Sequence, residues 1–165
     1  MGIREVNRKK RLQYARGKVH WTVDRNWKHV IFSDEMTIVI RRDGKIKVWR
    51  KTSEKWLGCC LGYLILSLGP SYTLKLMVWG SITNYGTGLL AFVDGNMNSQ
   101  KYIDTLEHYL WPVITKHFSN QHWYFMDGNA SVHRSVLTEA WRQDNNLPTF
   151  FWSPQSPDLN PIENV

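Results

Sequence analysis

Three acidic residues stand where apolar stretches of the sequence end. Asp34 closes VIFSDE, Asp127 closes YFMDGN, and Glu163 follows a proline-rich loop in DLNPIEN. Because the ends of neighbouring strands meet at one edge of a sheet, the three carboxylates are expected to converge. Carboxylate oxygens are ligands that Mg²⁺ and Mn²⁺ prefer, and two such ions can stabilise both the attacking and the leaving oxygen of a phosphodiester displacement. Asp34, Asp127 and Glu163 are therefore candidate metal ligands and catalytic residues.

Each of these residues also has an ordinary structural explanation. A single acid at the end of a strand is usually a surface cap. Asn160, Pro161 and Glu163 have the spacing of a capping box with a proline start. His133, six residues beyond Asp127, fits the first turn of a helix. Taken one at a time, these residues favour the structural explanation over the functional one.

The positive charge of the chain is concentrated near its N-terminus. The net charge is +7, but residues 1–56 hold 16 Lys and Arg against 6 Asp and Glu, and residues 57–165 hold 5 against 8. This asymmetry is typical of a surface that binds an anionic polymer such as DNA, although a solvated basic helix is the alternative. The residues expected to contact DNA phosphates are Lys9, Lys10, Arg11, Arg16, Arg41, Arg42, Lys45 and Lys47.

Several classes of protein are excluded by composition. No run of 18 apolar residues exists, so we expect no membrane span and no membrane partner. The only cysteines are the neighbours Cys59 and Cys60, which excludes a disulfide scaffold and a Cys-rich zinc site. Charged residues follow Met1 in place of a signal-peptide core, so we expect an intracellular protein.

The elements that must position the acids follow from periodicity. The pattern of residues 4–17 predicts a basic helix. Its apolar stripe is thin, so we expect the helix to lie on the surface or to await a partner. Residues 29–50 predict three antiparallel strands, at 29–33, 36–41 and 45–50, because Asp43-Gly44 is a strong hairpin signal. Asp34 is expected to end the first of these strands.

The rest of the chain alternates strands and helices. The pattern predicts, in order, strands at 74–83 and 88–93, a helix at 98–118, a strand at 122–126, a helix at 132–144 and a strand at 149–152. Asn98 or Ser99 is expected to cap the long helix, and Pro112 to kink it or start a new one. The strand at 122–126 should lie parallel to and beside 29–33. This order indicates an α/β fold with a mixed sheet flanked by helices.

Taken together, these motifs resemble one known family. The matching stretches are RKKRLQYAR, WKHVIFSDE, DGKIKVWR, LMVWGSIT with GTGLL, VDGNMNSQKYIDTLEHYLWP, NASVHRS and SPQSPDLNPIEN. They stand in the order found in the catalytic domain of mariner-superfamily DNA transposases of the Tc-one-like branch. The resemblance implies a ribonuclease-H-like fold and an Asp-Asp-Glu triad that binds Mg²⁺ or Mn²⁺. It also implies double-stranded DNA partners (transposon ends and target), a homodimer and a nuclear location.

The resemblance also divides the chain. It implies a basic helical linker at residues 1–20 and a ribonuclease-H-like catalytic domain at 21–165. Relative to the family this domain is expected to be truncated at both ends, since the family's helix-turn-helix region would precede it and the sequence stops two residues past Glu163. Such an end would leave the helix that presents Glu163 poorly anchored.

One departure from the family bears on catalysis. The family has Gln-Asp-Asn-Ala where this sequence has Asp127-Gly128-Asn129-Ala130, so alignment without a gap places the second catalytic acid at Gly128. In an extended strand, a shift of one residue turns a side chain to the opposite face. A local bulge at Gly128 would return the Asp127 side chain to the face of the other two acids.

Three functions remain open at this stage. The first is a transposase catalytic domain that cleaves and transfers DNA strands with divalent metal ions. The second is a catalytically inactive, transposase-derived remnant that binds DNA through its basic half. The third is a nuclease of the ribonuclease-H type that acts on RNA–DNA hybrids, which the fold would allow but the motif SPQSPDLNPIEN disfavours. Whether the chain is an enzyme depends on the register at Asp127 and Gly128.

Overall fold

The computed structural model describes residues 3–41, 73–149 and 152–164. The helices are α1 (Glu5–Lys18), α3 (Ser99–Thr105), α4 (Trp111–His117) and α5 (Val136–Asp144), and the strands are β1 (Val30–Arg41), β2 (Thr73–Thr83), β3 (Gly86–Thr87), β4 (Ala91–Val93) and β5 (Tyr124–Met126). Contacts divide the chain into two units, Met1–Met36 with Met77–Val165, and Thr37–Leu76. The candidate site lies in the first unit. No described helix is both long and apolar enough to cross a membrane.

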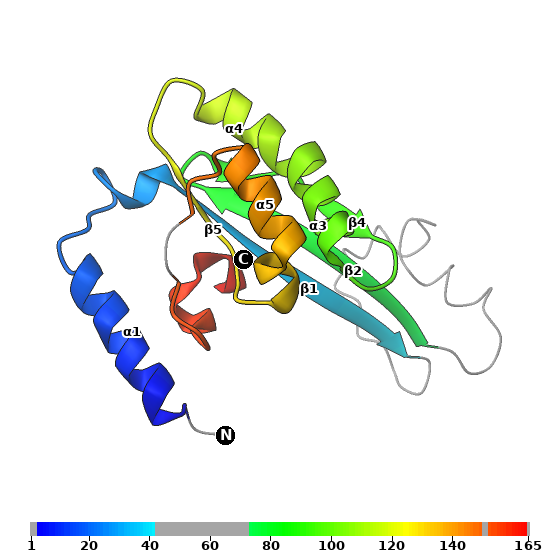
Figure 1. Ribbon diagram of the computed structural model, residues 1–165, viewed down its shortest axis with the longest axis horizontal. Helices are drawn as coiled ribbons and strands as arrows, with labels where there is room; N and C mark the ends of the chain where they lie inside the picture. Colours follow the sequence, from blue (N-terminus) through cyan, green and yellow to red (C-terminus); the bar gives the residue numbers. More distant parts are fainter. Residues whose placement is uncertain (1–2, 42–72, 150–151, 165) are drawn as a thin grey trace, which may run out of the picture. The chain divides into compact units, whose positions relative to one another are not determined.

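A mixed sheet forms the centre of the first unit. Its strand order is β3-β2-β1-β5, and β4 pairs with β2 from the same side as β3. The arrows of β1 and β2 run in opposite directions in Figure 1. β5 lies parallel to β1, with Val30 opposite Tyr124 and Phe32 opposite Met126. The predicted parallel pairing of 122–126 with 29–33 is therefore confirmed.

The first strand is longer than the sequence suggests. Residues 29–33 and 36–41 were expected to be separate strands, but β1 runs without interruption from Val30 to Arg41, so Asp34 lies within a strand. The polar residues at this point do not break the strand because their side chains find partners, as when Ser33 Oγ donates to Met126 O at 3.1 Å. The pairing of β1 with β5 ends at Phe32, opposite Met126, where β5 itself ends. The strand predicted at 45–50 lies outside the described residues.

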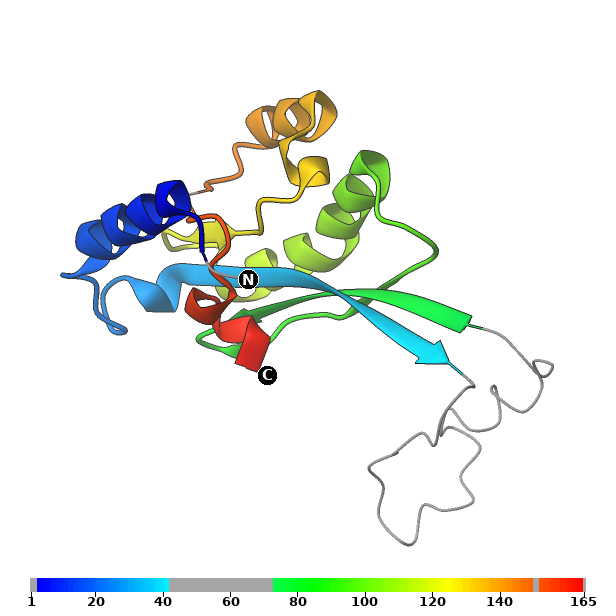
Figure 2. The same cartoon turned by 90° about the horizontal axis from the view of Figure 1, so that it is seen from below.

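The two faces of the sheet carry two different cores. Ile31 and Phe125 pack with residues of α3 and α4 on one face. Phe32 and Met126 pack with Trp152 on the other. Figure 2 shows α3 and α5 on one side of β1 and the C-terminal segment on the other. Because side chains alternate along a strand, this division also decides which face each acid occupies.

The long predicted helix is present and changes its winding in the middle. α3 is followed by a π-helical turn, Leu106–Leu110, and then by α4, which carries Pro112 in its first turn. Pro112 has no N–H to donate to the preceding turn, so a new helix, α4, starts there. A new start was one of the two outcomes predicted for Pro112.

The C-terminal third contains less regular structure than predicted. The helix predicted at 132–144 divides into a short 3-10 helix, Ser131–Arg134, and α5, because the Ser135 hydroxyl caps α5 by accepting from Thr138 N. Of the strand predicted at 149–152, Thr149 forms a parallel bridge with Phe125, and residues 150–151 lie outside the described residues.

Glu163 lies in a 3-10 helix, Pro161–Asn164, and not in an α-helix. The reciprocal capping box is replaced by a tighter turn, in which Asn160 Oδ1 accepts from Ile162 N at 3.4 Å. The main chain adds a second bond, since Glu163 N donates to Asn160 O at 3.2 Å.

The cap of the long helix can be tested directly. Asn98 Oδ1 accepts from Lys101 N at 2.9 Å, whereas Ser99 is the first helical residue. We expect Asn98→Ala to lower the free energy of unfolding by about 1 kcal/mol, and Ser99→Ala to change it by less than about 0.5 kcal/mol. Urea unfolding of both variants measures the difference, and equal losses would contradict the assignment of the cap to Asn98.

Candidate active site

Two of the three predicted acids meet in one cavity. Asp34 projects from β1 on the face that also carries Phe32, and Glu163 reaches it from the C-terminal 3-10 helix. The carboxylate of Glu163 is close enough to raise the pKa of Asp34. A cavity of about 210 Å³ is lined by both acids together with Gly128 and Asn160. A larger cavity of about 540 Å³ adjoins the same two acids.

The larger cavity has mainly apolar walls. Ile82, Leu89, Leu90 and Ile162 contribute to its lining beside the acid pair. An apolar cleft that ends on carboxylates lowers the local dielectric and so strengthens their interaction with a bound cation.

The environment of Asp34 disfavours a second negative charge. Burial, together with the nearby carboxylates of Glu163 and Glu35, raises the pKa of Asp34 to about 6, although the hydrogen bond from Glu35 N opposes this shift. That bond measures 2.8 Å to Asp34 Oδ1. Asn160 Nδ2 lies 3.4 Å from Asp34 Oδ2. Two carboxylates that repel each other in this way would be relieved by a cation between them.

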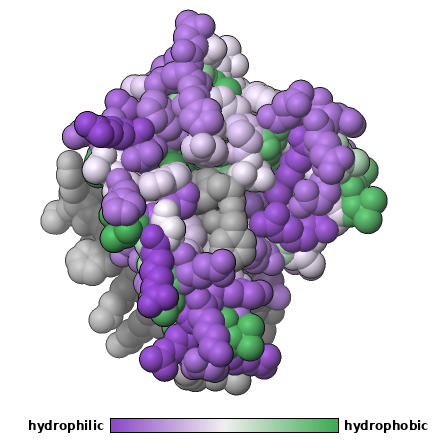
Figure 3. Space-filling model, turned by 60° about the vertical axis from the view of Figure 1, so that its left-hand side comes forward, coloured by the Kyte–Doolittle hydropathy of each residue, from purple (hydrophilic) through white to green (hydrophobic). Residues whose placement is uncertain are grey.

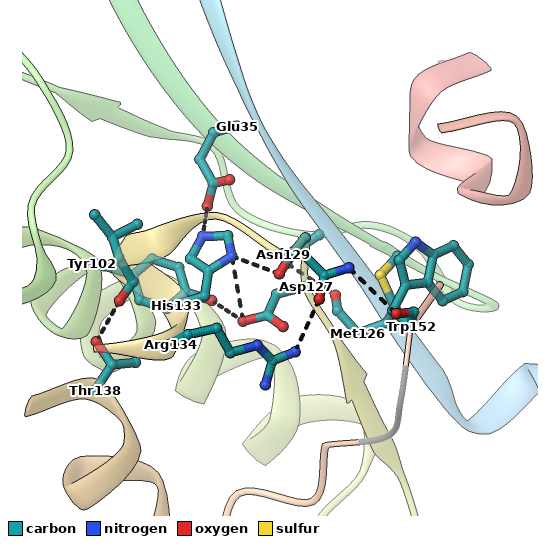
Figure 4. A network of polar contacts seen from close by, with 12 residues as sticks. Glu35, Tyr102, Met126, Asp127, Asn129, His133, Arg134, Thr138 and Trp152 are labelled. Atoms are coloured by element: carbon teal, nitrogen blue, oxygen red, sulfur yellow. Dashed lines mark hydrogen bonds and ion pairs between the residues drawn. The ribbon is translucent and has the colours of Figure 1, made fainter. Parts of the chain in front are cut away.

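Asp127 lies elsewhere, in the interior beneath the helices. Its side chain is 3% exposed and accepts a hydrogen bond from Tyr102 Oη at 2.7 Å. It also forms an ion pair with the buried guanidinium of Arg142. His133 Nδ1 lies 3.8 Å from the same carboxylate oxygen. Figure 4 shows Asp127 within this network of polar contacts.

The separation of the acids follows from alternation along β5. Phe125 faces the core of α3 and α4, and Met126 faces the opposite core. Asp127 therefore points to the side of Phe125, and Gly128 returns to the side of Met126, where it lines the cavity of Asp34 and Glu163. The structure thus brings Asp34 and Glu163 together and places Asp127 on the other face.

Gly128 has room for a side chain. A Cβ atom built there lies 3.7 Å from His133 Cε1, which is ordinary van der Waals contact, and the backbone is outside the left-handed region. The backbone of Gly128 therefore accepts a side chain, at a position that lines the cavity of Asp34 and Glu163.

A polar network that the sequence reasoning missed ties β1 to the loop after β5. His133 Nε2 lies 3.0 Å from Glu35 Oε1, and Nδ1 lies 2.8 Å from Gly128 O. Burial lowers the pKa of His133, but the hydrogen bond and charge of Glu35 outweigh it and leave the pKa raised. Alternation on β1 was the available signal, since it puts Glu35 on the face opposite Asp34. Nothing in the local sequence points to Tyr102 or Arg142.

The described residues do not supply three ligands for a metal centre. No group of three His, Cys, Asp or Glu side chains close enough to share an ion occurs within 3–41, 73–149 and 152–164. Asp34 and Glu163 are two carboxylates, which suits one Mg²⁺ whose remaining ligands are waters or phosphate oxygens. The residues present fit one cation and fall short of the predicted pair.

The candidate DNA contacts divide into three groups. Lys9, Lys10 and Arg16 are exposed on α1. Arg11 is engaged by Asp158 in an ion pair of 2.6 Å. The remaining candidates lie outside the described side chains, namely Arg41, Arg42, Lys45 and Lys47. Figure 3, which brings the side of α1 forward, shows a largely hydrophilic surface there.

The position of Asp127 makes a prediction about stability. Asp127→Asn leaves the buried charge of Arg142 without its counter-ion, so we expect the free energy of unfolding to fall by about 3–5 kcal/mol. Glu139→Gln is the matched control, because Glu139 also lies near Arg142, at 3.7 Å, but is 42% exposed. This control should cost less than about 1 kcal/mol. If urea unfolding shows equal effects for the two variants, Asp127 is not in the buried pair.

Comparisons with known proteins agree with this geometry. The family described as DDE superfamily endonuclease matches residues 66–165. The Tc3 transposable element transposase of Caenorhabditis elegans is 31% identical over 157 residues, which cover 94% of this chain and 44% of that protein. The Tcb1 transposase of Caenorhabditis briggsae is 28% identical, with 96% and 56% covered. The chain spans about half the length of the curated relatives it matches.

Solved structures show the same fold. A pre-cleavage Mos1 transpososome matches with a TM-score of 0.70 at 15% identity, covering 99% of this chain and 48% of that one. The Mos1 transposase catalytic domain with Raltegravir and Mg matches with a TM-score of 0.64 at 14% identity, covering 99% and 70%. The predicted ribonuclease-H-like mixed sheet is thereby confirmed. The relatives that it matches are transposases of the Tc1/mariner type. Since the matched family spans more than half of the residues, the chain belongs to the DDE superfamily of endonucleases.

Proposed function

We propose that this chain serves DNA transposition as a transposase catalytic domain whose acidic site is incomplete. Its substrate is double-stranded DNA, at the transposon ends and at the target. One observation carries the proposal. Asp34 and Glu163 converge on a cavity that is also lined by Gly128, the position at which the family has its second catalytic acid. Family membership and relatives that are all transposases support the assignment.

The cofactor we propose is a single Mg²⁺ or Mn²⁺ held by Asp34 and Glu163. Mos1 transposase structures with Mg and with Mn support the use of a divalent cation. When bound, such a cation stabilises charge on phosphodiester oxygens. Asp34 and Glu163 orient it, and the apolar wall of the larger cavity limits access of water.

Strand cleavage by this chain is expected to be weak because the third carboxylate is missing. Asp127 cannot replace it without depriving Arg142 of its buried partner, which would leave Arg142 with the more exposed Glu139 at 3.7 Å. The alternative function, a catalytically inactive remnant that binds DNA, differs from this proposal in lacking strand cleavage altogether. Weak Mn²⁺-dependent nicking of plasmid that is lost in Asp34→Asn distinguishes the two.

Assembly and location follow from the proposed reaction. Cut-and-paste chemistry requires two DNA ends to be held together, which favours a homodimer. Its substrate is chromosomal, which favours a nuclear location. The division of the chain into a basic linker at residues 1–20 and a catalytic domain at 21–165 stays a prediction.

Supplying the missing acid tests the proposal. We expect Gly128→Asp, with Asp127 kept in place to pair Arg142, to raise Mn²⁺-dependent nicking of supercoiled plasmid by about 100-fold, because misplacement of reacting groups costs a factor of this order. Gly128→Asn is the control of equal size without the charge, and it should remain at the level of the unmodified chain.

Two results would overturn this proposal. Gly128→Asp protein that is folded but no more active than Gly128→Asn would show that position 128 is not the missing ligand. Plasmid nicking by the unmodified chain that equals that of Gly128→Asp and is lost in Asp34→Asn would show that the site is already complete.

Binding of DNA should be electrostatic and independent of sequence. Affinity should fall steeply with salt, and Lys10→Ala, which removes an exposed cation of α1, should flatten the slope of log K against log salt by about 1. Lys116→Ala removes an exposed cation from α4 and should leave the slope unchanged. Fluorescence anisotropy with two unrelated duplexes measures both slopes. Binding that ignores salt, or that selects one duplex, would contradict this expectation.

A further inference from the structure

One face of α1 contacts the chain segment that leads to Glu163. Asn7, Arg11 and Tyr14 are spaced by four and three residues, so they lie on the same side of the helix. Asn7 Nδ2 donates to Gln155 Oε1 at 2.7 Å. The ring of Tyr14 meets that of Trp152 edge to face, with 5.1 Å between centroids. A single face of α1 thus contacts residues that lie nearly 150 positions further along the chain.

Arg11 is the centre of this contact. Its Nη1 and Nη2 donate to Asp158 Oδ1 and Oδ2 at 2.7 and 2.6 Å. Nη1 also donates to the main-chain oxygen of Gln155 at 3.1 Å. The planar guanidinium thereby ties together both ends of the turn at 155–158, in the paired geometry that Arg forms best with carboxylates.

The turn held in this way contains a strained residue. Gln155 has φ of 52°, in the left-handed region that side chains other than glycine rarely adopt. Such a conformation persists when the surroundings over-determine it. Both the side chain and the main-chain oxygen of Gln155 are held by α1. The helix therefore stabilises the bend that turns the chain back toward β1.

Short hydrogen-bonded turns connect this bend to the acid pair. Asn160 N donates to Pro157 O at 2.8 Å, and Glu163 N donates to Asn160 O at 3.2 Å. The Asn160 side chain is buried and faces Asp34. With no long flexible stretch between Asp158 and Glu163, the position of one sets the position of the other.

We propose that α1 holds the C-terminal segment, residues 153–164, in place (the clasp) and that Arg11 is a positioning residue, which sets Glu163 against Asp34. The proposal rests on the proposed function in one respect, since it assigns Glu163 to cation binding. Arg11 is then engaged within the protein, whereas Lys9 and Lys10, which are exposed on α1, remain available for phosphates. The segment of residues 1–20 acts as part of the catalytic unit.

Hydrogen exchange tests the clasp without any metal. In the full chain, Arg11→Ala should raise amide exchange in residues 153–164 by about 10-fold through local opening. Lys10→Ala removes the same charge from the next position and should leave exchange in these residues as it is in the unmodified chain. Equal exchange in the two variants would overturn the clasp.

Mn²⁺ titration tests the positioning role. Removal of a positive charge should by itself favour a cation, yet Arg11→Ala is expected to weaken Mn²⁺ binding by about 5- to 10-fold, and Lys10→Ala to leave it unchanged or slightly tighter. Exchanging the partners, with Arg11→Asp and Asp158→Arg together, keeps the net charge and should recover most of the affinity. Wild-type affinity in Arg11→Ala would overturn the positioning role.

The two proposals fail in different ways. If the unmodified chain binds Mn²⁺ no better than Asp34→Asn does, the proposed cation site is wrong. The exchange measurement still decides whether α1 holds the segment, because it does not depend on a metal.

Discussion

The parallel pairing of β1 with β5 is the constraint on which the rest of the site depends. Its register places Phe32 beside Met126, and alternation then assigns every following side chain to one face or the other. Asp34 and Gly128 fall on the face of the C-terminal segment, and Asp127 falls on the face of the helices. Slipping the strands by one residue would exchange both cores at once, so packing holds this register firmly.

Asp127 is a charged residue of the protein interior that takes no part in the proposed metal site. Its carboxylate is surrounded by the Tyr102 hydroxyl and by Arg142, and His133 lies close to it. A buried carboxylate is tolerated when its partners satisfy it, and it becomes very costly when one of them is removed. The ion pair of Asp127 with Arg142 thus helps to hold α5 against the sheet, which is a structural role and not metal binding.

Much of the fold could be predicted from the sequence because its signals are local. The basic helix and the long helix follow from periodicity, and Asn98 was one of the two expected caps. The pairing of 122–126 with 29–33 joins distant residues and was expected from the ribonuclease-H-like fold. The continuity of β1 through Asp34 could not, because it depends on partners that are distant in sequence. A local pattern of polar residues looks like a strand end, although neighbouring strands satisfy those residues.

The site could be predicted in part for the same reason. Period-two alternation was enough to put Asp127 and Gly128 on different faces, once the strand at 122–126 was recognised. The ion pair with Arg142 and the contacts of Arg11 join residues that no local pattern relates. The 3-10 winding around Glu163 arises from the Asn160 side chain, which competes with a regular helical start.

The Asp127 and Arg142 pair has an evolutionary consequence. Position 127 is locked, because a substitution there must be matched by a second one at 142 to avoid a buried unpaired charge. Position 128 is free, since its backbone and surroundings accept a side chain. A glycine codon becomes an aspartate or glutamate codon by a single nucleotide change. Two adjacent codons in this chain are therefore under opposite constraints: selection for folding preserves the first, and only selection for chemistry can choose the second.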